Sequence, residues 1–456
     1  MPLTLPAMTS TGAGPCAGAM AGGPIGGDAL LRAQGDGRFG YRTRPHRYWT
    51  KGARQCHLQV IERPEEKAPA VTKIDRIESI IVDVPTVRGH VLSMTTMMTQ
   101  SVVLVRVRFS DGSEGLGEGA SIGGLSYGPE SVESVKLAID TYIAPALIGM
   151  DADAIAAASA HMEKAVKGNP IARAAVECAL WDGLGRRAGL SVAQLFGGRI
   201  HDRLPVAWTL ASGNSQTDID EAERMLDARR HRDFKLKIGK RGVKHDIAHV
   251  AAIAAAVGDR GTIRVDVNQA WSLTEARYGA RGLQEIGCIL IEQPVSRDKL
   301  AALKSLTDGY EIAIMADEVL QGPADAMRVA ANRSADVFAV KVCQSGGLKP
   351  ASDVIAIARA AGIDLYGGTM LESGLGTAAA IQLFATVPEW QFGTEMFGPL
   401  LLKDEILATP LEYKDFSVTV PTGPGFGVSL DDDKVNFYRR DRTVSVRAVS
   451  GAIAGE

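Results

Sequence analysis

Strand-like and helix-like runs alternate along most of the second half of the chain. Short runs of apolar and β-branched residues recur from Pro205 onward, and helical sequence such as 244–256 and 350–361 lies between them. Alternation of this kind is typical of parallel sheets with crossover helices. The strand-like runs predict a (β/α)8-type barrel, and they span residues 205–210, 234–238, 262–267, 288–292, 312–316, 337–342, 364–368 and 390–394.

A different pattern precedes this barrel. Three strand-like runs separated by turn sequence come first, at 74–85, 101–109 and 114–120. Three helical stretches follow, at 130–144, 152–165 and 171–188. A β-meander followed by helices predicts an α+β domain at 73–203, ahead of the barrel at 204–410. Residues 411–440 have room to return to the first domain.

The two ends of the chain lack such patterns. Residues 1–37 are rich in Gly, Ala and Pro, and residues 38–54 are basic. Nothing in residues 1–72 can bury enough apolar surface to fold, so we expect a disordered extension or a start codon placed too far upstream. The alternative is a basic arm for an anionic partner. Residues 441–456 are expected to be a tail.

Composition agrees with a soluble enzyme of two domains. The chain has 456 residues, of which 46% are hydrophobic and 23% charged, and its formal net charge is −3. That charge gives no reason to expect nucleic acid as a partner, and no apolar run is long enough to span a membrane. The 5 cysteines are scattered without CxxC spacing, which indicates free thiols in a reducing cytoplasm.

The second expected strand of the barrel carries two lysines on one face. Side chains alternate along a strand, so Lys235 and Lys237 point one way while Phe234, Leu236 and Ile238 point the other. The apolar face suits the outer helices, which leaves both lysines directed into the barrel. Because a buried lysine is costly unless it is paired or deprotonated, this pair indicates a catalytic site rather than a frayed surface strand.

The next three expected strands each end in an acid, and the acids are Asp266, Glu292 and Asp317. Consecutive strands are neighbours in a barrel and functional groups gather at their C-terminal ends, so the three carboxylates should converge. Oxygen ligands without Cys or His favour a hard divalent ion, Mg²⁺ or Mn²⁺. One such acid alone would be an ordinary helix cap or loop acid. Three in register predict a metal site.

Lys341 ends the sixth expected strand, which stands opposite the second strand in an eight-stranded ring. Ammonium groups would then face both sides of a substrate held by the metal, as proton transfer next to a carboxylate requires. We expect clustered cations and desolvation to lower the pKa values of these lysines toward neutrality. Glu372, in the loop after the seventh expected strand, is a candidate for shaping the site or orienting a lysine, and an ordinary loop acid is the alternative.

With this lysine pair and acid triad, residues 73–440 resemble the enolase superfamily. The muconate-lactonising subgroup fits best, because longer stretches are similar to it: 206–213, 229–232 with 234–239, 265–269, 368–372 and 397–402. The resemblance implies a modified TIM barrel, with the α+β domain as an N-terminal capping domain. It also implies a homo-oligomer, an octamer by analogy, in the cytoplasm.

The resemblance further implies the roles of individual residues. Mn²⁺ or Mg²⁺ would be held by Asp266, Glu292 and Asp317. Lys237 would protonate the α-carbon, Lys235 and Lys341 would support the charge, and Glu372 would line the site. The expected substrate contacts are His90, Ile122, Tyr127 and Asn268. The implied reaction is the reversible closure of cis,cis-muconate, a dicarboxylate, to muconolactone through a metal-stabilised enolate, in the degradation of catechol by the β-ketoadipate route.

Several alternatives keep the same site. A chloromuconate enzyme is one, although Ile122, Tyr127 and Glu372 look more like the enzymes for unchlorinated muconate. A dipeptide epimerase, an N-acylamino acid racemase or an o-succinylbenzoate synthase would use the same lysines and acids. A mandelate-racemase-type enzyme is disfavoured because Lys341 stands where it would need a histidine. A non-enzymatic protein on the same barrel would show decay of the triad or the lysines, and none is seen.

Overall fold

The computed structural model describes residues 71–440 of the chain. The predictions for the extension at 1–72, apart from its last two residues, and for the tail at 441–456 therefore lie outside the described residues. No helix within the described part is long and apolar enough to cross a membrane.

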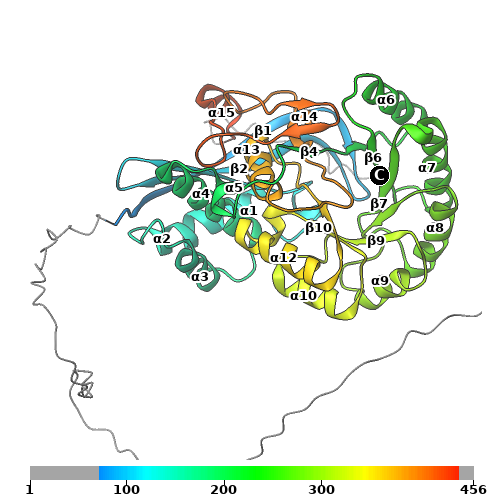
Figure 1. The fold of residues 1–456 in the computed structure, drawn as a ribbon, viewed down its shortest axis with the longest axis horizontal. Helices are drawn as coiled ribbons and strands as arrows, with labels where there is room; N and C mark the ends of the chain where they lie inside the picture. The colour runs from blue at the N-terminus through cyan, green and yellow to red at the C-terminus, as the bar shows by residue number, and fades with distance from the viewer. Residues whose placement is uncertain (1–70, 441–456) are drawn as a thin grey trace, which may run out of the picture. The chain divides into compact units, whose positions relative to one another are not determined.

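The N-terminal part is a three-stranded antiparallel sheet packed on helices (Figure 1). Its strands, in the order β1-β2-β3, are β1 (Ile74–Val91), β2 (Thr96–Phe109) and β3 (Glu114–Ala120). Its helical segments are η1 (Gly124–Ser126), α1 (Val132–Ala138), the π-helix η2 (Ile139–Ile143), α2 (Ala144–Leu147), α3 (Ile155–Ala165), α4 (Pro170–Ala188) and α5 (Val192–Leu195).

Two glycines in β3 allow α4 to lie directly against the sheet. A Cβ atom on Gly115 would overlap the backbone of Ala179, and one on Gly117 would overlap the backbone of Ala175. The glycine alternation in this strand is therefore a packing feature of the sheet and the helix that covers it.

A parallel sheet with helices around it forms the second part (Figure 1). Its strands are β5 (Trp208–Leu210), β6 (Asp233–Lys237), β7 (Thr262–Asp266), β8 (Leu290–Glu292), β9 (Ala313–Ala316), β10 (Val337–Val340) and β11 (Asp364–Gly367). The connecting helices are α6 (Ser215–Asp227), α7 (Val243–Val257), η3 (Gly258–Arg260), α8 (Leu273–Glu285), α9 (Leu300–Thr307), α10 (Pro323–Asn332), α11 (Val342–Ser345), α12 (Leu348–Ala361) and α13 (Gly374–Phe384). The prediction of an enolase-type modified TIM barrel is confirmed.

The ring closes through single bridges instead of an eighth strand, so the prediction of a regular strand there is wrong. The sheet has 7 strands in the order β11-β10-β9-β8-β7-β6-β5. Thr394 makes parallel bridges to Val206, before β5, and to Gly367, at the end of β11. Gly393 has a φ of 70° and its N–H donates to the carbonyl of Trp390, 3.0 Å away, which forms a turn where regular pairing would run.

The C-terminal segment packs back against earlier parts of the chain. It contains α14 (Gly398–Leu401), β12 (Tyr413–Lys414), β13 (Ser417–Thr419) and α15 (Asp432–Tyr438). Strand β13 pairs with β4 (Arg203–Pro205), so the first expected barrel strand is divided between two sheets. Arg440 forms an ion pair with Asp83 of β1.

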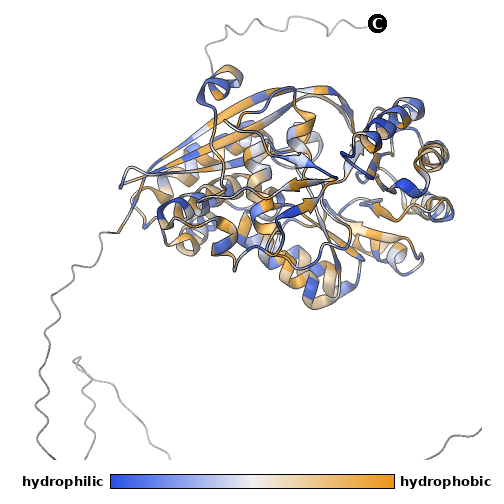
Figure 2. Cartoon of the chain, turned by 45° about the horizontal axis from the view of Figure 1, so that its top comes forward, coloured by the Kyte–Doolittle hydropathy of each residue, from blue (hydrophilic) through white to orange (hydrophobic). Residues whose placement is uncertain are grey.

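Two apolar clusters pack against the barrel sheet, one on its outer face and one on its inner face. The large cluster includes Phe234 and Leu236 and extends to the helices and the N-terminal sheet. The small cluster fills the barrel interior and consists of Leu290, Met315, Val337, Ala339 and Tyr366. Figure 2 shows hydrophobic residues concentrated along the strands, with mixed hydropathy on the outer helices. The strand ends above the small cluster are left for polar groups.

Candidate active site

The two lysines of β6 both point into the barrel, as the alternation predicts. Lys235 is only 3% exposed. Its Nζ lies 3.1 Å from Oε2 of Glu292 and 3.9 Å from Oδ2 of Asp266, and it also pairs with Glu395. Lys237 Nζ lies 2.5 Å from Oδ2 of Asp266. The two lysines therefore contact acids from β7, from β8 and from the loop beyond β11.

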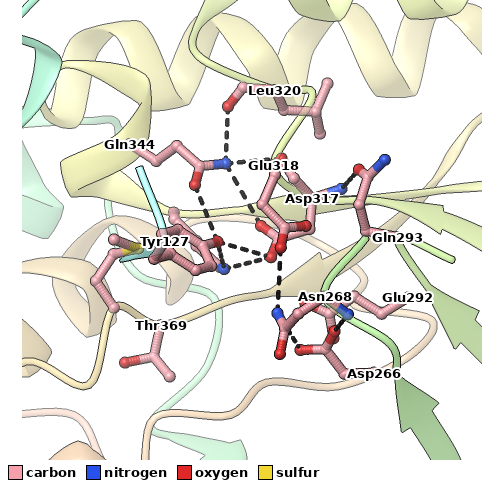
Figure 3. Close-up of polar contacts among 12 residues, drawn as sticks. Tyr127, Asp266, Asn268, Glu292, Gln293, Asp317, Glu318, Leu320, Gln344 and Thr369 are labelled. Atoms are coloured by element: carbon pink, nitrogen blue, oxygen red, sulfur yellow. Dashed lines mark hydrogen bonds and ion pairs between the residues drawn. The ribbon is translucent and has the colours of Figure 1, made fainter. Parts of the chain in front are cut away.

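The three acids of the predicted triad come together at the C-terminal edge of neighbouring strands (Figure 3). Asp266 ends β7, Glu292 ends β8 and Asp317 directly follows β9. All three are fully buried. Burial raises the pKa of Glu292 well above its usual value, and the negative charges of Asp266 and Asp317 add to that rise. The register of the strands is sufficient to place these carboxylates within electrostatic reach of one another.

Lys341 and Tyr127 complete the polar cluster on the opposite side. Lys341 Nζ donates to Oδ2 of Asp317 at 2.7 Å and to Oη of Tyr127 at 2.9 Å. The Tyr127 hydroxyl in turn donates to Oδ2 of Asp317 at 2.9 Å (Figure 3). Burial works against ionisation of Asp317, but the charge of Lys341 outweighs it and lowers the pKa of this carboxyl. A residue of the N-terminal part thus contacts the barrel acids directly.

The expectation that the lysine pKa values fall toward neutrality is wrong for Lys235 and Lys341. Burial does lower the pKa of Lys235, but Glu292 and Glu395 outweigh it, so the pKa is raised well above its usual value. Burial likewise lowers the pKa of Lys341, and Asp317 together with Glu292 raises it further than burial lowers it. Sequence reasoning counted the desolvation and the neighbouring cations and left out the carboxylates that pair with each lysine.

The donor set fits a divalent cation, although the lysines occupy many of its oxygens. Among residues 71–440, no three acidic, imidazole or thiol side chains are already spaced to hold a metal ion. Oε1 of Glu292 is nevertheless buried without a hydrogen-bond partner. A buried carboxylate oxygen without a partner, in a cluster of oxygen ligands, suits a hard cation such as Mg²⁺ or Mn²⁺. Such a cation would compete with the lysines for the same carboxylates.

Asn268 belongs to the same polar cluster. Its Oδ1 accepts from Lys237 Nζ at 3.2 Å, and its Nδ2 donates to Asp266 and to Glu318 at 3.2 Å each. Both Nδ2 protons are thus engaged by protein groups, and Asn268 does not line the cavity that the lysines share. Its contact with substrate stays a prediction, and the geometry supports a role in positioning Lys237.

Glu318 is a buried acid that sequence reasoning passed over. Burial, then the charges of Asp317 and Asp266, raise its pKa to about 8. Its Oε2 is buried and has no partner in the described part of the chain. Its position directly after Asp317, just after the end of β9, was the feature of the sequence that could have identified it as part of the site.

A small cavity lies at the centre of this cluster, with a volume of about 10 Å³. His90, Ile122 and Tyr127, three of the predicted substrate contacts, reach it from the N-terminal part. The other residues around it are Leu92, Thr209, Lys235, Lys237, Lys341, Thr369, Leu371, Glu395 and Phe397. The cavity thus brings together side chains from both parts of the chain and all three predicted lysines.

His90 presents a neutral imidazole to this cavity. It is 1% exposed, and neither ring nitrogen has a hydrogen-bond partner among the described residues. Burial lowers its pKa well below the usual value, and the nearby charge of Lys237 lowers it further. A buried imidazole without a partner can donate to or accept from a ligand without first breaking a protein contact.

Two acids have places that differ from expectation. The carboxylate of Glu372 turns back to its own loop, where it accepts from the backbone N–H of Met370 at 2.9 Å and from the hydroxyl of Thr369. Glu372 does not line the cavity, so its predicted place there is not supported. Glu395 does line the cavity and was missed. It directly follows Thr394, so the strand-end rule that selected the other acids would have found it.

Each of the two parts of this chain matches a known protein family. Residues 76–197 match the family described as mandelate racemase / muconate lactonizing enzyme, N-terminal domain. Residues 218–434 match the family described as enolase C-terminal domain-like. Together these matches span most of the described residues.

Individual relatives are similar over nearly their whole length. Muconate cycloisomerase 1-2 of Acinetobacter lwoffii is 55% identical over 81% of this chain and 96% of its own. A chloromuconate cycloisomerase of Cupriavidus pinatubonensis is 46% identical over 81% of this chain and 99% of its own. The crystal structure of muconate lactonizing enzyme from Pseudomonas fluorescens with muconolactone has 50% sequence identity and a TM-score of 0.80, covering 81% of this chain and 100% of that one.

Proposed function

This chain belongs to the mandelate racemase / muconate lactonizing enzyme family, and on that premise we propose that it interconverts cis,cis-muconate and muconolactone. The observation that carries the proposal is the small cavity at which Lys235, Lys237 and Lys341 meet beside a buried acid triad. The muconolactone complex of the relative from Pseudomonas fluorescens, at 50% identity, supports the same reaction.

Lys237 is the proposed proton donor of the lactonising direction. A carboxylate oxygen of muconate adds to the double bond, a C–O bond forms, and the electron pair moves to the α-carbon and its carboxylate as an enolate. Lys237 then passes a proton from Nζ to that carbon and recovers one from solvent. Asn268, whose Oδ1 lies 3.2 Å from Lys237 Nζ, holds the ammonium group in place. In the reverse direction the neutral amine removes the same proton.

Lys235 and Lys341 bring positive charge to the developing enolate. Each is buried and held by carboxylates, Lys235 by Glu292 and Glu395, and Lys341 by Asp317. Fixed charges of this kind stabilise a developing anion without reorganising in the transition state. The unpartnered imidazole of His90 supplies a hydrogen bond to a substrate carboxylate.

Enzymes of this family depend on a divalent metal ion, and we propose Asp266, Glu292 and Asp317 as its ligands and Mn²⁺ or Mg²⁺ as the ion. Such an ion would stabilise negative charge on the substrate carboxylate. The predicted homo-oligomer and the cytoplasmic location stay predictions of the sequence.

Chloromuconate is the second candidate substrate, because relatives at 46% and 47% identity bear the name chloromuconate cycloisomerase. The names of the relatives favour muconate chemistry over the dipeptide epimerase, racemase and synthase alternatives. Ile122 and Tyr127, which line the cavity, are the residues at which we expect the choice between muconate and chloromuconate to be made.

The deciding experiment is an absorbance assay with the purified full chain and Mn²⁺. Closure of muconate to the lactone shortens the conjugated system, so the ultraviolet absorbance falls as the reaction proceeds. We expect kcat/KM to be highest for cis,cis-muconate and lower for chloromuconates. Epimerisation of an Ala-Glu dipeptide, monitored by exchange of its α-proton with solvent, should be negligible. Inert muconate together with an epimerised dipeptide would overturn the proposal.

A further inference from the structure

A second, much larger cavity lies directly beside the catalytic one. Its volume is about 320 Å³, and it shares Leu92 and Lys237 with the catalytic cavity. The catalytic cavity, at about 10 Å³, has room for about one water molecule. The larger cavity falls at the lower end of the range for small-molecule sites. A ligand therefore finds room next to Lys237 before it finds room at the reacting position.

The walls of the larger cavity are rich in basic groups. They come from the end of β6, the loop after it and helix α7, and they are Lys237, Lys240, Arg241, His245 and His249. We call this set the basic antechamber. Of these five, Lys237 pairs with Asp266 at 2.5 Å and His249 lies 3.4 Å from Asp218.

The two exposed cations of the antechamber have no acidic partner. Among residues 71–440, Lys240 makes no ion pair and no side-chain hydrogen bond, and Nη1 of Arg241 approaches only Nε2 of His245, at 3.5 Å. By contrast, Lys304 on α9 pairs with Asp308 at 2.9 Å. Positive charge is therefore left uncompensated at this opening.

The acids nearby are already engaged by protein donors. Asp246 lines the antechamber, and its Oδ2 accepts from the backbone N–H of Gly239 at 3.0 Å and from Nε1 of Trp271 at 3.3 Å. Asp218 accepts from the backbone N–H of Ser212 at 3.1 Å through Oδ1, and its Oδ2 lies 3.4 Å from Nε2 of His249. Among the described residues, neither acid pairs with Lys240 or Arg241, so these two side chains are left to attract an anionic ligand.

We propose that the basic antechamber binds a small dicarboxylate anion and delivers it to Lys237. This inference rests on the proposed function, because it takes the substrate to be a dianion. A dianion is attracted to uncompensated cations along a low-dielectric wall, which raises its local concentration and its rate of association. Lys240 and Arg241 act on capture of the substrate and take no part in the proton transfer.

The test uses the full chain loaded with Mn²⁺ and the double variant Lys240→Ala, Arg241→Ala. We expect kcat/KM for muconate to fall about fivefold to twentyfold at low ionic strength, with kcat within about twofold of the wild-type value. The difference in kcat/KM between wild type and variant should vanish at about 0.5 M salt. Charges farther apart than the short Debye length at that concentration are largely screened. The matched control is Lys164→Ala, Arg359→Ala, which removes two exposed cations distant from the cavity and should leave kcat/KM unchanged.

A second measurement does not depend on turnover. Adipate, a saturated six-carbon dicarboxylate that cannot lactonise, is titrated calorimetrically into the Mn²⁺-loaded wild type and both double variants. Weaker adipate binding in Lys240→Ala, Arg241→Ala alone supports the antechamber, even if muconate proves not to be the substrate. Equal affinity in all three proteins overturns it, and so does a fall in kcat as large as the fall in kcat/KM.

Discussion

Glu177 offers a stability test that is independent of the catalytic cluster. This buried residue of α4 accepts from the backbone N–H groups of Leu348 at 2.7 Å and Lys349 at 3.0 Å, and from Nε1 of Trp181 at 2.8 Å. Helix α12 begins at Leu348, and the preceding Gly347 has no side chain to cap it. Glu177 therefore supplies from α4 the cap that α12 lacks, which joins the two parts of the chain.

The pKa of Glu177 sets the direction in which pH changes the free energy of unfolding. Burial raises this pKa from 4.5 to about 7, against the opposing influence of the backbone donors Lys349 and Leu348. Below about pH 4.5 both the folded and the unfolded chain hold the proton, so the carboxyl has no effect on pH dependence. Between pH 4.5 and 7 only the unfolded chain releases it. The free energy of unfolding that the protonated Glu177 contributes is therefore present at low pH and is lost as the pH rises. The loss amounts to roughly 2 to 3 kcal/mol between pH 5 and 8.

The assay compares the free energy of unfolding of wild type and Glu177→Gln in urea at pH 5 and pH 8. The amide stays neutral, so the variant lacks the loss that the wild type suffers on raising the pH. It also turns an NH₂ group toward a donor, which costs about 1–3 kcal/mol at every pH. We expect the variant to be clearly less stable than the wild type at pH 5. The difference between their free energies of unfolding should be smaller by roughly 2 to 3 kcal/mol at pH 8.

The control is Glu285→Gln, at an exposed position near the end of α8. Its difference from wild type should be small and equal at both pH values, because an exposed carboxylate makes little contribution to stability. A gap between wild type and Glu177→Gln that is the same at pH 5 and pH 8 would refute the reasoning, because it would show that Glu177 is ionised throughout this range.

Two further substitutions test the catalytic cluster. Lys237→Ala should lower kcat by about 10²- to 10⁴-fold, the usual contribution of an acid–base group, while the manganese content measured by atomic emission stays at the wild-type level; a near-normal rate would contradict the assigned role. Glu395→Gln should lower kcat by about 100-fold, because Lys235 loses its close partner and shifts from the reacting position. Glu389→Gln, at an exposed site a few residues away, is the control and should leave kcat unchanged.

Local patterns in the sequence were enough to place the lysines and acids of the cluster. Period-two alternation put Lys235 and Lys237 on the inner face, and the regular recurrence of strands put Asp266, Glu292 and Asp317 on adjacent strand ends. Both are properties of backbone geometry, because side chains alternate on any strand and successive parallel strands of a barrel are neighbours. The (β/α)8-type fold followed from the same recurrence.

Only the tertiary structure decided how these groups are used. Thr394, not a full strand, closes the barrel, because a turn at Gly393 interrupts pairing. Glu395 enters the cavity while Glu372 turns back to its own loop, a choice that depends on side-chain direction within irregular segments. Lys235 has a raised pKa rather than a lowered one because its acidic partners come from distant positions in the sequence. Sequence pattern fixes which groups reach a strand end, and distances across the ring fix which of them pair, because electrostatic interactions depend on separation in space.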